Sequence, residues 1–141
     1  MNSVQIEKNI RPKWLTVVSL MAILFGLATI KAGGTVIFTE QGRSNAGNYV
    51  AFILWFNFIA GFGYVVAGIM MLRLKSCAKR LSAILAVLSL LFFIALGLYI
   101  LNGGAFETRT IAAMTLRSTF WIVIASILFK SKVLDPIDCK C

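Results

Sequence analysis

A short basic turn lies between two long apolar segments in the middle of this chain. Residues 73–80 carry four cations in eight positions, with apolar runs before them (residues 49–72) and after them (residues 81–101). A run of about 20 apolar residues is long enough for a helix to cross a bilayer. Cations concentrate in the cytosolic loops of such proteins. The sequence therefore predicts two transmembrane helices joined by a turn on the cytosolic side.

The composition favours lipid over water as the solvent for most of the chain. Its 141 residues are 60% hydrophobic and 13% charged, and the mean hydropathy is +0.90. Soluble domains are roughly 45–50% apolar and about 25% charged. The net charge of +9 comes from cations beside apolar runs, a pattern typical of contact with anionic headgroups. We expect a bilayer containing anionic lipid as partner, and no nucleic acid.

Two further apolar runs bring the number of predicted spans to four. The fold class is therefore all-α, a polytopic membrane protein whose four transmembrane helices form one antiparallel bundle over residues 1–141, with short basic tails. Glycines mark residues 31–48 as the first loop, and the glycine pair after Asn102 ends the third span. The first span lacks a good signal-peptide cleavage site after it and is expected to be retained. The predicted spans are residues 14–33, 49–72, 81–101 and 110–129.

The distribution of cations predicts that both termini lie inside the cell. With that orientation ten cations are cytosolic and three lie in the outer loops, which is the bias that short loops follow reliably. The cytosolic group is Lys8, Arg11, Lys13, Arg73, Lys75, Lys79, Arg80, Lys130, Lys132 and Lys140, and the outer group is Lys31, Arg43 and Arg109.

Arg117 is the residue that fits an apolar span least. It lies about eight residues into the fourth predicted span, where a charge is costly and needs a partner inside the bundle. Asn57 lies at a matching depth in the second span, so we predict that the two face each other or share water.

Polar residues near the outer ends of the spans could complete a pocket around Arg117 that opens outwards. Tyr99, Glu107 and Arg109 could close it, and Glu40 is a second acid that could neutralise Arg117. One hypothesis is a site for a lipid headgroup, a quinone or a small acid, because arginine offers a planar fork of donors. The alternative is that Arg117 snorkels outwards and only ties helices together.

The sequence offers no visible catalytic or metal-binding constellation. It has no histidine, and every acid lies outside the predicted spans, so no nucleophile–base pair is apparent. The pair Cys139 and Cys141, with Cys77, could form a soft thiolate clip for Cu(I) or Zn(II), but a lone Cys-x-Cys at a terminus is weak evidence. We expect no enzyme activity, no catalytic residue, no cofactor and no metal site.

The central hairpin resembles small DoxX-like four-helix membrane proteins. The resemblance is carried by NFIAGFGY at residues 57–64, by the end of that helix around Gly68 and by the basic turn. The segment GGAFETRTIAAMTLR at residues 103–117 also resembles small bacterial membrane proteins of unknown role. The resemblance implies a four-helix fold in the bacterial inner (plasma) membrane, and it carries over no functional residues.

Two classes of function fit these observations. The first is an accessory or structural membrane protein that packs with itself, as a homo-oligomer, or with a membrane complex. The alternative is binding or transport of a small anionic, lipid or quinone ligand in an outward-facing pocket around Arg117.

Overall fold

The protein is all-helical over the residues that its computed structural model describes, 12–131. In this range four helices are long and apolar enough to cross a membrane, which confirms the predicted number of spans. The basic tails and the Cys139–Cys141 pair fall outside it. The helices are α2 (Lys13–Phe38), α3 (Glu40–Ala46), α4 (Ala51–Leu72), α5 (Cys77–Leu101) and α6 (Thr108–Lys130).

The first predicted loop is mostly helical, which corrects the expectation for residues 31–48. Helix α2 continues to Phe38 instead of ending at residue 33. Gly33 lies inside the helix and does not end it. A Cβ on Gly33 would lie 3.2 Å from Cβ of Phe58, so the role of this glycine is close packing against α4. The extended backbone of Thr39 separates α2 from α3, and its hydroxyl accepts the Gly42 N–H at 3.0 Å as a helix cap.

The basic turn is shorter than predicted, because α5 begins at Cys77 and not at residue 81. Lys79 is buried, and its Nζ donates to the carbonyl oxygen of Ser131 at 2.9 Å. Ser131 is the residue that follows α6, and a cation at a helix C-terminus is stabilised by the helix dipole. This contact joins the start of α5 to the end of α6.

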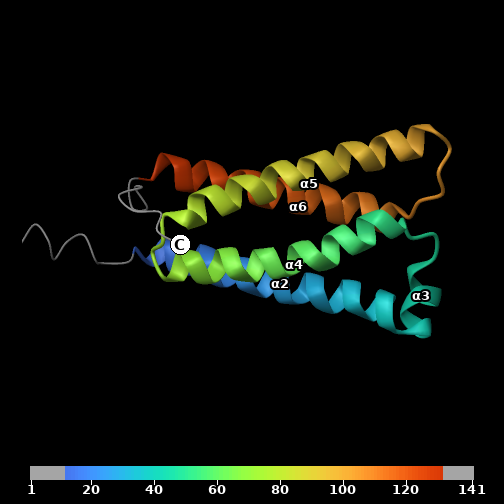
Figure 1. Cartoon of the computed structure of the whole chain (residues 1–141), viewed down its shortest axis with the longest axis horizontal. Helices are drawn as coiled ribbons and strands as arrows, with labels where there is room; N and C mark the ends of the chain where they lie inside the picture. The colour runs from blue at the N-terminus through green and yellow to red at the C-terminus, as the bar shows by residue number, and fades with distance from the viewer. Residues whose placement is uncertain (1–11, 132–141) are drawn as a thin grey trace, which may run out of the picture.

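The long helices form two closely packed pairs. Helix α2 packs along α4 and α5 packs along α6, while α4 also contacts α5. Figure 1 shows α3 and the 102–107 connection at one end of the bundle and the 73–76 turn at the other. Aromatic side chains fill the centre between the pairs, with ring centroids 4.8 Å apart for both Tyr64–Trp121 and Phe25–Phe120.

Glycines allow the backbones of α2 and α4 to approach closely. A Cβ on Gly26 would lie 2.8 Å from the carbonyl oxygen of Gly61, and one on Gly61 would lie 2.7 Å from Cγ1 of Ile30. Gly68 is equally tight, since its Cβ would lie 2.5 Å from Cγ1 of Ile23. Helices in lipid associate through such small residues, because burial of apolar surface no longer drives them together.

Replacing Gly61 with leucine should force α2 and α4 apart. Overpacking a tight interface costs about 1–3 kcal/mol, so the melting temperature of the detergent-solubilised protein should fall clearly. Gly97→Leu is the matched control, since a Cβ at Gly97 meets nothing within 4 Å. Equal melting temperatures for the two variants would contradict the close packing of α2 on α4.

Candidate functional site

Arg117 lies inside the bundle, where its guanidinium reaches two other helices, α2 and α4. The residue is only 6% exposed. Its Nη1 donates to Oδ1 of Asn57 on α4, and its Nη2 donates to the hydroxyl of Thr29 on α2 at 3.4 Å. The contact between Arg117 and Asn57 confirms the prediction made from their matching depths.

Two aromatic rings hold the same charge from the side of the core. The guanidinium carbon lies 5.9 Å from the ring centre of Phe25 and 5.8 Å from that of Tyr64. An arginine at this distance over a ring face is attracted by the negative potential of the ring. Tyr64 is fixed in turn, because its hydroxyl lies 3.5 Å from that of Ser89. The charge therefore has neutral partners on α2 and α4.

Arg117 has no anionic partner in the part of the chain that the structure describes. No carboxylate among residues 12–131 forms an ion pair with it, and its Nε lacks a hydrogen-bond partner. Glu107, the acid predicted nearby, instead accepts the Asn48 N–H at 3.3 Å, and Glu40 starts α3. Buried charges in spans are usually paired, so this guanidinium retains the capacity to bind an anion.

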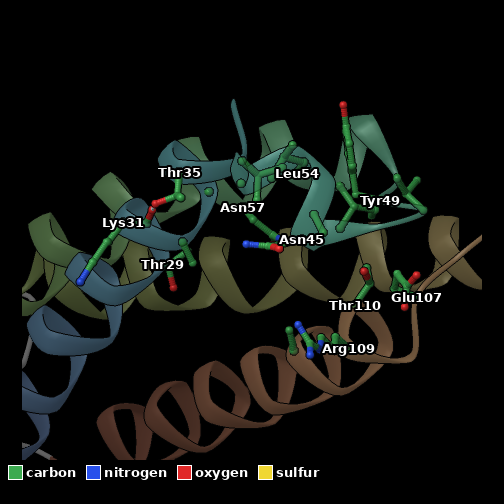
Figure 2. Close-up of a pocket in the computed structure, with 18 of the residues that line it drawn as sticks. Thr29, Lys31, Thr35, Asn45, Tyr49, Leu54, Asn57, Glu107, Arg109 and Thr110 are labelled. Carbon is green, nitrogen blue, oxygen red and sulfur yellow. Dashed lines mark hydrogen bonds between the residues drawn. The ribbon is translucent and has the colours of Figure 1, made fainter. Parts of the chain in front are cut away.

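A cavity of about 620 Å³ extends from Arg117 to the α3 end of the bundle. Its walls come from α2, α3, α4 and α6, whereas α5 contributes no lining residue. Figure 2 shows Tyr49, Glu107 and Thr110 at one side of the lining residues, with Thr29 and Asn57 between them and Lys31. Between these polar groups the walls are mostly small or apolar, including Ala28, Ala32, Val36, Ile53 and Ala113.

The structure brings together four of the five predicted site residues. Arg117, Asn57, Glu107 and Arg109 all line the cavity; whether they bind a ligand stays a prediction. Tyr99 does not line it, and the expectation that it closes the pocket is corrected. Its ring packs edge-on against that of Phe52 at 6.0 Å, because the cavity lies on the side of the bundle away from α5.

Thr29 is the functional candidate that sequence reasoning did not include. It lies about nine residues from the end of α2 at Phe38, which is close to the depth of Arg117 within α6. With the first span ending at residue 33, Thr29 would have been too shallow to meet Arg117. A prediction of the full length of α2 would therefore have placed Thr29 at the depth of Arg117.

No group of three or more His, Cys, Asp or Glu residues with the spacing of a metal site occurs in residues 12–131. The predicted thiolate clip involves Cys139 and Cys141, which lie outside that range.

No family model, curated protein or solved structure matches the chain at a significant level. The resemblance to DoxX-like proteins stays a prediction. The fold and the cavity define the protein at the level of its class: a membrane protein with four candidate spans and a cationic cavity between them.

Removing the amide partner of Arg117 should destabilise the protein, and removing both partners should cost less. A hydrogen bond to a charged group contributes about 1.5–3 kcal/mol, and an unsatisfied buried partner adds a penalty. We therefore expect Asn57→Leu to lower the melting temperature in detergent, with partial recovery in the double variant Asn57→Leu/Arg117→Met.

Asn102→Leu serves as control, because the side chain of Asn102 is exposed and donates to the nearby Leu98 carbonyl oxygen on its own helix. The two side chains would act independently if the melting temperature of the double variant lay below that of Asn57→Leu by as much as Arg117→Met alone lowers the melting temperature of the wild type.

Proposed function

We propose that this protein binds a small anionic or carbonyl-bearing ligand within the membrane, in the cavity that ends at Arg117. The observation that supports this most is a buried guanidinium that lines a cavity of about 620 Å³ and forms no ion pair with any carboxylate of residues 12–131. Arginine presents donors in a planar fork that suits carboxylate and phosphate groups. In a low-dielectric site such an interaction is much stronger than in water.

The neighbours of Arg117 suit this role. The hydroxyl of Thr29 donates to the carbonyl oxygen of Phe25 at 2.8 Å and accepts from Arg117, so it holds the guanidinium in place. Oδ1 of Asn57 also accepts from Arg117, which leaves the amide nitrogen of Asn57 to donate to a ligand. The site therefore combines a fixed charge with one neutral donor.

The size and lining of the cavity limit the ligand. Pockets for small molecules are about 300–1,000 Å³ and mostly apolar, with few polar groups. This cavity fits that description, with polar groups at depth and near the α3 end. A lipid headgroup, a quinone or a small acid with an apolar body would match both regions.

A structural role is the second candidate function. Arg117 hydrogen-bonds across α2 and α4 from its place on α6, and α2 and α6 otherwise have few direct contacts. On this hypothesis Arg117 is a staple, and the protein serves as an accessory subunit of its own oligomer or of a membrane complex.

We also propose the orientation that the cation bias favours. The spans run in antiparallel order with both termini in the cytoplasm of a bacterial cell, so that the α3 end and the cavity mouth face outwards. The bias of ten cations against three supports this arrangement in the inner membrane.

Mass spectrometry of the gently solubilised protein should detect a retained anionic small molecule or lipid. Arg117→Gln should abolish retention, because the amide lacks the charge, and Arg117→Lys should keep part of it. Arg80→Gln is the control, as Arg80 is exposed at the other end of the bundle. If Arg117→Gln retains the same species at the wild-type level, the binding function is excluded, and the structural role of Arg117 in joining helices is the candidate that is left.

A membrane-impermeant thiol reagent should leave Cys77 unlabelled in intact cells and label it after permeabilisation. The variant Asn102→Cys should react in intact cells, because Asn102 is exposed and directly follows the far end of α5, the helix that starts at Cys77. Reaction of Cys77 in intact cells of a Cys139→Ser/Cys141→Ser background would show that the orientation is inverted.

A further inference from the structure

We infer that the ligand is an anionic phospholipid that enters the cavity sideways, through a slot between α2 and α6. Its phosphate reaches towards Arg117 while its acyl chains stay in the bilayer. This inference rests on the proposed function and names the class of ligand. It follows from the shape of the wall between these two helices and from the spacing of the cations on α6.

The slot between α2 and α6 is bordered by alanines. Ala28 and Ala32 lie one turn apart on α2, and Ala113 lies on α6. All three line the cavity and all three are exposed. Helices α3 and α4 contribute other lining residues of the cavity, whereas α2 and α6 have few direct contacts with each other, so no described helix covers the side between α2 and α6. In a membrane this side faces hydrocarbon.

The slot ends at the depth of Arg117. About one turn beyond Arg117, on the side away from α3, the rings of Phe25 on α2 and Phe120 on α6 meet with their centroids 4.8 Å apart. The two rings bridge the gap that the alanines leave open. A molecule entering from the side can therefore reach Arg117 but cannot pass beyond it along this slot.

Cations follow the slot along one stripe of α6. Arg109, Ala113 and Arg117 are spaced by four residues, so they share a face, and the two arginines are about 12 Å apart along the helix. Glu107 forms no ion pair with Arg109 in the described residues 12–131, and its carboxylate accepts the Asn48 N–H at 3.3 Å. A phosphate near Arg109 thus finds a second arginine deeper in the slot, with Ala113 between the two arginines on this face of α6.

The lateral opening favours a lipid over a soluble acid. A soluble anion would enter from the water at the α3 end and would need no opening towards hydrocarbon. A phospholipid needs that opening, because its chains cannot follow the headgroup into a cavity of about 620 Å³. The small side chains along the slot leave room for the glycerol region of such a lipid.

The experiment measures lipid retention by native mass spectrometry after incubation with phosphatidylglycerol, with phosphatidylcholine, or with soluble sn-glycerol 3-phosphate. The wild type should retain phosphatidylglycerol in preference to phosphatidylcholine. Ala113→Phe should reduce this retention about tenfold or more, equivalent to about 1.4 kcal/mol, because the ring fills the slot. Ala112→Phe adds the same bulk at the neighbouring exposed position, which lies outside the cavity, and should retain lipid normally.

A second pair of variants tests the opposite wall in case Ala113→Phe does not fold. Ala32→Phe on α2 should reduce retention in the same way, and Leu27→Phe, at an exposed position of α2 outside the cavity, should not.

Three outcomes would overturn the inference. If glycerol 3-phosphate displaces the lipid and Ala113→Phe matches Ala112→Phe, entry is from water, and the proposed anion site still stands. Equal retention of phosphatidylglycerol and phosphatidylcholine by the wild type would exclude selection of an anionic lipid. Unchanged retention in Arg117→Gln would exclude the anion site as well as the lipid.

Discussion

The structure depends on how one guanidinium charge is kept inside an apolar bundle. A charged side chain at mid-membrane costs at least about 2.5–3.5 kcal/mol on insertion scales. Hydrogen bonds to a charged group contribute about 1.5–3 kcal/mol each, so the contacts of Arg117 with Asn57 and Thr29 contribute a stabilisation of the same order as that cost. The bundle can therefore hold the charge without a carboxylate partner. The guanidinium of Arg117 thus remains able to attract an anion.

The packing of α2 on α4 determines where the charge can be held. Gly26 and Gly61 let the two backbones come together, and this places Thr29 and Asn57 in one layer beside Arg117. At the α3 end, Gly47 has a φ of +63° and leaves no room for a side chain beside the carboxylate of Glu107. That carboxylate binds the backbone of Asn48, so it ties the α3–α4 connection to the start of α6 at the cavity mouth.

Much of the fold, and one contact of the site, can be predicted from the sequence. Span number follows from apolar length, and the Arg117–Asn57 contact follows from rise per residue, because both residues are counted from the same side of the membrane. The extension of α2 could not be predicted, because a glycine pair such as Gly33–Gly34 is also typical of loops. Only the contact of Gly33 with Phe58 shows that it serves helix packing. Thr29 depends on that extension. Tyr99 was misplaced because depth alone does not tell which side of a helix faces the cavity.

The most direct test of a lipid phosphate at Arg117 is the dipolar coupling between guanidinium ¹⁵N and lipid ³¹P. It would be measured by solid-state NMR on arginine-labelled protein in bilayers that contain phosphatidylglycerol. Other arginines near headgroups contribute background, which the Arg117→Gln variant defines. A short-range ¹⁵N–³¹P coupling in the wild type that disappears in this variant is the predicted result. Identical dephasing of the two proteins would show that no phosphate reaches the buried charge, and would contradict the account.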